Sequence, residues 1–371
     1  MKIQIEKLQL KYGGFVAIEN LDLQIDDGES LVLLGQSGCG KTSTMRCVAG
    51  LEEPSAGRIV IDDVVVFDSE TGVNLPPNKR NVGMVFQSYA VWPHMTVFHN
   101  VAYSLKVQRA AKREVRERVM AALTTVGLDS FADRGASLLS GGQMQRVALA
   151  RSLVMQPSVL LLDEPLSNLD ARLRDRLRID LREIQLRLGL TCIYVTHDQG
   201  EAFALADRVA MMQRGRIVQI GTPQEIYAQP ASASIADFLG VVNVFECTVP
   251  PSEAGYHDAQ LTGYGMTVRS NLGVADGGSE MKICVRPEDF TVTADESADS
   301  SEDIVPNHWR GRIVVSSFQG DSTRYAVQLD EGPEIQALQS RKRRAAFDIG
   351  DRVWIGLDPD AAQLLPAEVA S

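Results

Sequence analysis

Phosphate-binding chemistry is concentrated in one octapeptide near the N-terminus. Its residues are Gly35, Gln36, Ser37, Gly38, Cys39, Gly40, Lys41 and Thr42, and Ser43 follows them. Glycines allow the backbone to fold closely enough for successive N–H groups to point at an anion. Lys41 can then reach the β and γ phosphates of a nucleotide, and the Thr42 hydroxyl can ligate Mg²⁺. The alternative, a glycine-rich turn with a surface lysine, is disfavoured because a strand pattern precedes the octapeptide and a helix pattern follows it.

Two adjacent carboxylates, Asp163 and Glu164, end the apolar run 159–162. Burying neighbouring acids is costly unless a cation and a reaction use them. The simplest assignment makes Asp163 the carboxylate on the Mg²⁺ side. Glu164 is then the catalytic base that orients and deprotonates an attacking water.

Two more polar side chains follow strand-like runs. Gln87 ends the run 82–86, and His197 comes directly after the run 193–195. Open α/β sheets place their ligand contacts at the carboxyl ends of the strands, so we expect His197 to contact a γ-phosphate. For Gln87 two interpretations stay open: a ligand contact, or an ordinary glutamine at a strand end.

A Ser-Gly-Gly turn precedes a second helical pattern, predicted from Met144 to Leu153. The turn consists of Ser140, Gly141, Gly142 and Gln143. Ser140 can cap the helix, and the glycines leave backbone N–H groups accessible to an anion. A cap is the commoner reason for such a turn, and its residues alone leave the anion contact open.

The elements that must position these side chains alternate between strands and helices. Buried strands are predicted at 31–34, 82–86, 159–162 and 193–195. Helical spacing runs from Ala102 to Gly127, where Gly127 is placed as the cap. After the turn 167–170 another helix carries an apolar stripe that we assign to the core: Leu173, Leu177, Leu181, Ile184 and Leu188. A hairpin, 209–220, and a helical stretch, 223–240, end this α/β part of the chain.

From about residue 242 onward short strand patterns dominate, which predicts a small β-barrel or sandwich. The predicted strands are 244–249, 266–269, 281–285, 312–316, 324–329 and 352–355. The segment 294–303 has five acids and no large apolar residue. We expect it to be a disordered loop and assign it no function.

Composition limits the class of protein. The chain has 371 residues, enough for two or three domains, and 37 basic against 48 acidic residues give a net charge of −11. This balance argues against a nucleic-acid partner, because such binding depends on Lys and Arg neutralising phosphates. The five cysteines form no C-x-x-C pair, which fits a reducing cytoplasm. The N-terminal segment lacks a signal peptide, and no stretch is apolar for the length of a membrane span.

Taken together, the glycine loop, Gln87, the Ser140–Gln143 turn, Asp163-Glu164, Asp170 and His197 resemble, in order and spacing, the ATP-binding cassette (ABC) transporter ATPases. The segment 86–97 is similar to the importer branch typified by the maltose-importer ATPase. The resemblance implies an α/β P-loop NTPase cassette over 1–240, with a mixed sheet and a helical subdomain at about 88–155. An all-β OB-like (TOBE) domain, which includes 285–289, is then expected over 241–371.

The resemblance also implies partners and roles. Two copies of the chain would bind ATP and Mg²⁺ between the phosphate loop of one and the Ser140–Gln143 signature of the other. Tyr12 would stack on adenine, Ser140 and Gly142 would touch the γ-phosphate of the opposite site, and Asp170 would bridge the dimer. Gln87 would sense Mg²⁺ and the attacking water, while the loop 89–95, with Tyr89, Val91, Trp92 and Met95, would dock on a membrane permease.

The expected assembly is a homodimer with two permease subunits, fed by a solute-binding protein, at the cytoplasmic face of the inner membrane. Three other classes compete. DNA-repair or chromosome ATPases of this kind carry long heptad arms, and translation factors carry two cassettes; neither feature occurs here. A regulatory protein built around the C-terminal barrel stays open, though Glu164 and His197 favour turnover. The cargo also stays open among polyamine, ferric ion, phosphonate, sulfate and sugars, and Trp92 points weakly away from sugars.

Overall fold

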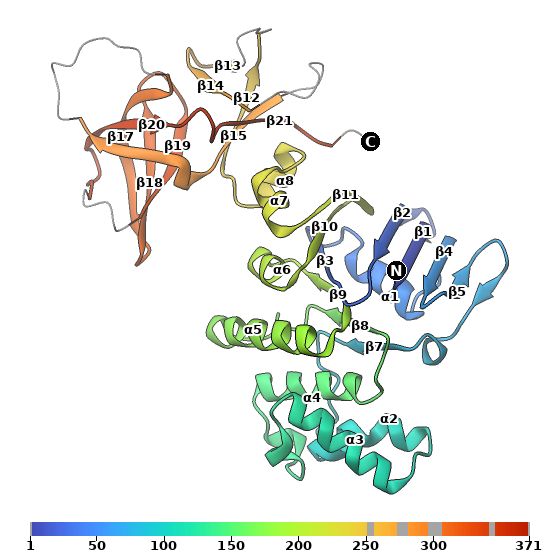
Figure 1. Cartoon of the computed structure of the whole chain (residues 1–371). Coiled ribbons are helices and arrows are strands. Elements are labelled where there is room, and N and C mark those ends of the chain that lie inside the picture. The colour runs from blue at the N-terminus through green and yellow to red at the C-terminus, as the bar shows by residue number, and fades with distance from the viewer. Residues whose placement is uncertain (1, 251–255, 273–280, 296–305, 341–345, 370–371) are drawn as a thin grey trace. The chain divides into compact units, whose positions relative to one another are not determined.

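The computed structural model describes residues 2–250, 256–272, 281–295, 306–340 and 346–369. The chain forms two compact units, Met1–Ile226 and Tyr227–Ser371 (Figure 1). The domain limits expected from the sequence, 1–240 and 241–371, remain a prediction.

A six-stranded sheet forms the centre of the first unit. In spatial order its strands are β11 (Arg216–Gly221), β10 (Arg208–Gln213), β3 (Ser30–Leu34), β9 (Thr191–Thr196), β8 (Val159–Asp163) and β7 (Val82–Val85). All neighbours pair in parallel except β11, which is antiparallel to β10. β3, β8 and β9 are buried along their whole length, as expected for apolar strands covered on both faces. Because these strands are parallel, their carboxyl ends meet at one edge of the sheet.

A second, antiparallel sheet packs on helix α1 (Lys41–Ala49) and on the central sheet. Its strands in spatial order are β2 (Phe15–Ile25), β1 (Ile3–Tyr12), β4 (Ala56–Ile61), β5 (Val64–Asp68) and β6 (Val73–Asn74). The shared core joins Leu33 of β3, Val48 of α1 and Val195 of β9 to the inward side chains of β1 and β2. This packing fixes the loop between β3 and α1, which holds the glycine octapeptide.

Three helices form a separate cluster beyond β7, seen in green below the sheet in Figure 1. They are α2 (Val97–Val107), α3 (Lys112–Thr125) and α4 (Gly141–Leu153). The single helix predicted from Ala102 to Gly127 is therefore wrong: the chain breaks between α2 and α3, where Arg109 has a φ of 59°. Gly127 does adopt the left-handed φ, +69°, that a helix-ending glycine favours.

Helix α5 (Ala171–Leu188) lies between this helical cluster and the central sheet, and α6 (Gln199–Leu205) follows β9. The predicted apolar stripe of α5 lies only partly in the core. Leu177 and Ile184 are buried, whereas Leu188 is 44% exposed. The last turn of α5 is exposed, so the prediction that Leu188 belongs to the core is wrong.

The second unit is almost entirely β. Its helices are α7 (Pro223–Ala228), most of which precedes the boundary, and α8 (Ala233–Phe238). One sheet has the order β14 (Thr267–Ser270), β13 (His257–Leu261), β12 (Asn243–Thr248), β15 (Met281–Val285) and β21 (Gln363–Pro366). The other has the order β16 (Phe290–Ala294), β20 (Arg352–Leu357), β17 (His308–Phe318), β18 (Ser322–Leu329) and β19 (Glu334–Ser340). Side chains of both sheets share one core, which confirms the predicted OB-like fold class.

Four strands of this unit, β13, β16, β19 and β21, were not predicted from the sequence. Ala294, placed in the expected acidic loop, is instead the last residue of β16 and pairs with Val353. Most of that predicted loop, 296–303, lies outside the described residues. Across the described helices, none combines the length and the hydrophobicity needed to cross a membrane.

Candidate active site

The glycine octapeptide forms a tight loop between β3 and α1. Gly38 and Gly40 have φ values of +80° and +104°, which favour glycine. A Cβ at Gly40 would lie 2.7 Å from the carbonyl oxygen of Ala17, and one at Gly35 would lie 2.3 Å from that of Met212. Because α1 starts at Lys41, the unpaired N–H groups of its first turn face this loop. The backbone here fits a bound phosphate chain.

The Lys41 ammonium lies over this loop. Its Nζ donates to the carbonyl oxygens of Gly35 at 2.8 Å and Gln36 at 2.9 Å, and lies 3.7 Å from the Cys39 sulfur. The side chain is 5% exposed, and within the described residues no carboxylate forms an ion pair with it. A buried cation without an anionic partner fits a site whose ligand supplies the negative charge.

Two side chains with oxygen atoms that can bind a hard cation, Thr42 and Asp163, lie close together at the end of β8. The Thr42 hydroxyl donates to Asp163 Oδ1 at 3.0 Å. Burial raises the pKa of the Asp163 carboxyl above its ordinary value. No group of three or more His, Cys, Asp or Glu side chains that could hold a metal occurs in the described residues. This donor set fits Mg²⁺, which uses one or two protein oxygens together with substrate phosphates.

The three side chains predicted to be catalytic lie together at the carboxyl ends of β7, β8 and β9. Glu164 Oε1 lies 3.2 Å from His197 Nδ1, and Glu164 Oε2 accepts from Gln87 Nε2 at 3.4 Å. Glu164 has a φ of 42°, and its N–H donates to the Val195 carbonyl at 3.0 Å, so β9 holds it in this rare conformation. Gln87 thus contacts the expected base, and it makes no hydrogen bond to Thr42 or Asp163 in the described residues.

Sequence reasoning missed the residues that hold Gln87. Ser167 Oγ accepts from Gln87 Nε2 at 3.3 Å and donates to the Glu164 carbonyl at 2.9 Å. Asn168 Nδ2 donates to the Gln87 carbonyl at 2.9 Å. Ser167 and Asn168 were interpreted only as part of a turn. Their place three and four residues after Glu164 was the only available signal.

Tyr12 ends β1, and its ring is 49% exposed. Its hydroxyl donates to Glu52 Oε2 at 2.5 Å, and this hydrogen bond is the main cause that raises the pKa of Tyr12. A hydrogen bond with the hydroxyl of Ser43, in the first turn of α1, lowers the pKa of Tyr12 and so opposes this effect. Tyr12 therefore stands beside the start of α1 with an open ring face, and a flat group such as a base can stack there.

The Ser140–Gln143 turn caps α4, which begins three residues before the predicted Met144. Ser140 Oγ accepts from the Gln143 N–H at 3.4 Å, and Gln143 Oε1 accepts from the Ser140 N–H at 3.0 Å, so the two form a capping box. A Cβ at Gly142 would lie 3.1 Å from Leu173 in α5. Asp170 caps α5 by accepting from the Leu173 N–H at 3.0 Å. Within the described residues no hydrogen bond links this turn or Asp170 to the phosphate loop.

The loop that follows Gln87 differs from the expected exposed apolar cluster. Tyr89 is 8% exposed, so its assignment to a docking surface is wrong. Tyr89 and Ala90 both have positive φ values, 62° and 49°, and this turn directs the tyrosine ring inward. Trp92 is half-buried, with its ring centroid 4.5 Å from that of Tyr103. Pro93 and His94 remain exposed.

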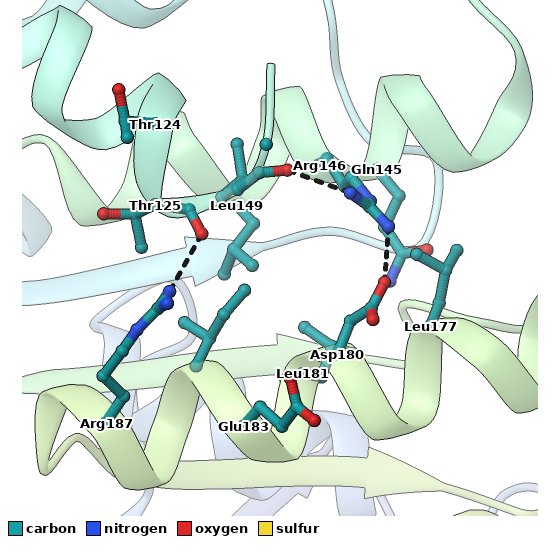
Figure 2. Close-up of a pocket in the computed structure, with 13 residues that line it drawn as sticks. Thr124, Thr125, Gln145, Arg146, Leu149, Leu177, Asp180, Leu181, Glu183 and Arg187 are labelled. Atoms are coloured by element: carbon teal, nitrogen blue, oxygen red, sulfur yellow. Dashed lines mark hydrogen bonds and ion pairs between the residues drawn. The ribbon is translucent and has the colours of Figure 1, made fainter. Parts of the chain in front are cut away.

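A cavity of about 250 Å³, not foreseen from the sequence, lies where the end of α3, α4 and α5 meet (Figure 2). Arg146 forms an ion pair with Asp180 and donates to the Val126 carbonyl at 3.1 Å. Arg187 of α5 donates to the Thr125 carbonyl at 3.0 Å. Gln145 is buried, and its Oε1 has no hydrogen-bond partner in the described residues. Polar contacts around this cavity therefore join the helical cluster to α5.

Comparisons with known proteins agree with this site. A family model described as "ABC transporter" matches residues 18–167, and one described as "TOBE domain" matches residues 283–365. An Fe(3+) ions import ATP-binding protein of Brucella melitensis is 45% identical over 330 residues, which cover 89% of this chain and 88% of the relative. A spermidine/putrescine import ATP-binding protein of Nitrosomonas eutropha is 40% identical over 366 residues, which cover 98% of each.

Two solved structures are similar to part of this chain. The ABC transporter protein cbiO1 of Clostridium perfringens has a TM-score of 0.56 and 31% identity, over 65% of this chain and 95% of its own. A dimeric ATP-binding cassette, MJ0796, in a post-hydrolysis state with ADP and Pi, has a TM-score of 0.51 and 29% identity, over 60% of this chain and 98% of its own. The predicted fold and ATPase activity are confirmed: the chain belongs to the import ATP-binding proteins of the ABC transporter family, with an ATPase cassette followed by a TOBE domain.

Proposed function

We propose that two copies of this chain couple Mg²⁺-dependent ATP hydrolysis to solute uptake through partner permease subunits. One observation carries this proposal: Glu164, His197 and Gln87 meet within hydrogen-bonding distance at the sheet edge that also bears the phosphate loop. A carboxylate held between an imidazole and an amide, beside an unpaired buried ammonium, suits attack of water on a phosphoryl group.

Each side chain then has a distinct task. Glu164 accepts the proton of the attacking water, and its hydrogen bonds to Gln87 and His197 fix its direction. Lys41 and the N–H groups of the loop neutralise the β and γ phosphates. His197 contacts the γ-phosphate. Thr42 and Asp163 would hold Mg²⁺, with Gln87 as its predicted sensor, and the ion would neutralise charge on the phosphate oxygens.

We infer a homodimer because, within the described residues, one copy does not join its Ser140–Gln143 turn to its own phosphate loop. The Ser140–Gln143 turn offers the N–H groups of Gly141 and Gly142 at a helix start, yet no hydrogen bond in the described residues joins it to the phosphate loop of its own chain. The dimeric state of the similar MJ0796 cassette supports a second copy as the missing part. Ser140 and Gly142 of one copy then contact the nucleotide of the other, and Asp170 lies at the dimer contact.

The membrane partners are inferred from the relatives and from the loop after Gln87. The relatives are named for import of Fe(3+) ions and of spermidine/putrescine, and both cargoes are cations. We infer a cationic cargo, delivered by a solute-binding protein to two permease subunits. The chain is then peripheral, at the cytoplasmic face of the inner membrane. The exposed Pro93 and His94, with the half-buried Trp92 beside them, form the inferred contact with the permease.

Hydrolysis by the purified chain tests the proposal first. We expect Mg²⁺-dependent release of phosphate from ATP and a loss of at least about a hundredfold in Lys41→Ala, because the phosphates lose their buried counter-charge. The unsubstituted chain should also co-purify with two polytopic membrane subunits when these are expressed together. Turnover in Lys41→Ala at the wild-type rate would contradict the assignment of the site. Failure of the chain to co-purify with any membrane subunit would contradict the transport role.

A further inference from the structure

Arg151, near the end of α4, contacts the loop that follows Gln87. Its Nη1 donates to the Ala90 carbonyl, and its guanidinium carbon lies 4.2 Å from the centre of the Trp92 ring. The capping turn at Ser140 is at the opposite end of the same helix. Helix α4 therefore carries the signature turn at its start and, near its end, Arg151, which contacts this loop.

The loop is held from a second side by α2. Asn100 accepts from the Trp92 N–H at 2.9 Å and donates to the Trp92 carbonyl at 3.1 Å, and Tyr103 packs against the Trp92 ring. At its start, by contrast, Gln87 is fastened to residues that follow β8. The loop thus joins the helical cluster to the catalytic edge of the sheet.

The conformation of the loop needs outside support. Tyr89 and Ala90 are consecutive non-glycine residues in the left-handed region, which is costly and persists only where surrounding contacts impose it. Arg151 donates to the carbonyl of one of these two residues. It is half-buried, and no carboxylate of the described residues pairs with it, so the carbonyl and the indole face are what compensate its charge.

We propose that Arg151 is a positioning residue that transmits the position of the signature helix to Gln87, through Ala90 and Trp92. This inference depends on the proposed function, in which α4 approaches the nucleotide of a second copy. A planar guanidinium can stack on the indole and donate in its own plane to a carbonyl at the same time. A lysine ammonium cannot do both, so the coupling requires arginine.

Steady-state hydrolysis by the full chain separates this role from simple packing. In Arg151→Met and in Arg151→Lys we expect kcat to fall about tenfold to a hundredfold and KM for ATP to change less than about twofold, because the phosphate loop is untouched. Arg118→Met is the matched control. Arg118 is also half-buried in the helical cluster and donates to a carbonyl, that of Val154 at 2.7 Å, but it does not contact the loop. Its kcat should remain near that of the wild type.

Tryptophan fluorescence gives a second readout. With Trp309→Phe and Trp354→Phe, Trp92 is the only tryptophan of the chain. ATP with Mg²⁺ should change its emission when Arg151 is present, and the change should disappear in Arg151→Lys although ATP still binds. An unchanged kcat with a lowered melting temperature, or an emission change that survives the substitution, would overturn the inference. Absence of hydrolysis in the unsubstituted chain would instead overturn the proposed function, and the fluorescence comparison would still decide the coupling.

Discussion

Asp163 illustrates how one residue can serve the site at the expense of stability. Its side chain is buried and accepts a hydrogen bond from Thr42, yet burial raises the pKa of its carboxyl. The folded chain therefore binds a proton at Asp163 more tightly than the unfolded chain does. The contribution of this group to stability is favourable below its unfolded pKa and is lost as the pH rises through its folded pKa.

Asp163→Asn should consequently raise the melting temperature of the nucleotide-free chain at pH 7, because the amide removes an unfavourable buried charge. The gain should shrink as the pH falls toward the range where the carboxyl is protonated in both states. Mg²⁺-dependent hydrolysis should be lost in the same variant. Thermal scans at pH 7 and at acidic pH, together with an activity assay, measure both effects. A lower melting temperature at neutral pH would show that the Thr42 hydrogen bond outweighs the burial of charge.

Among the elements, the loop between β7 and α2 combines packing with proposed docking. Trp92 lies between Tyr103 and Arg151 and is only half-buried. We expect Trp92→Ala to lower the free energy of unfolding by about 1–3 kcal/mol, less than the ~3–5 kcal/mol typical of a fully buried tryptophan. The same variant should lose retention on the permease, because the loop no longer holds its shape.

Two measurements decide between the roles of Trp92: the melting temperature of the isolated chain and co-purification with the permease subunits. Trp354→Ala is a suitable control, since Trp354 is also half-buried and stacks with an arginine, Arg310, but lies in β20 of the second unit. A loss of the full core magnitude with normal assembly would mean that Trp92 only packs.

The elements also show what the sequence could reveal. Glu164 and His197 follow buried apolar strands directly, so the local pattern was enough to place them at one edge. The break between α2 and α3 was missed because Gln108–Ala111 contains no glycine or proline, the residues that usually mark a helix end in a sequence. Ser167 and Arg151 were missed because each acts on a residue more than sixty positions away, and no local pattern records such a contact.

At the scale of the whole molecule, the proposed site is complete only when two chains meet. If Glu164 is the base, Glu164→Gln should keep ATP binding while slowing hydrolysis by about 10²–10⁴, roughly 3–5 kcal/mol of barrier. A dimer should then accumulate in the presence of ATP, because the bound nucleotide stays intact between the two chains.

Light scattering after size-exclusion chromatography measures this dimer in the Glu164→Gln variant with ATP and Mg²⁺. ADP in place of ATP serves as the control and should leave the chain largely monomeric. A monomer under both conditions would count against the shared site. Adding Ser140→Ala to Glu164→Gln should weaken the dimer, because that turn is the inferred contact with the opposite nucleotide.

The capping box at Ser140 has a consequence in donor and acceptor terms. A serine hydroxyl has one proton to give and two lone pairs to receive, and the cap occupies a lone pair by accepting from the Gln143 N–H. The cap does not use the proton. The hydroxyl can therefore cap the helix and still donate to a phosphate oxygen of a nucleotide bound to another chain. Aspartate would cap the helix as well, but its carboxylate brings no proton and would repel a phosphate. The lone pairs of the Ser140 hydroxyl thus serve helix initiation, and its proton is available for the proposed contact with a nucleotide.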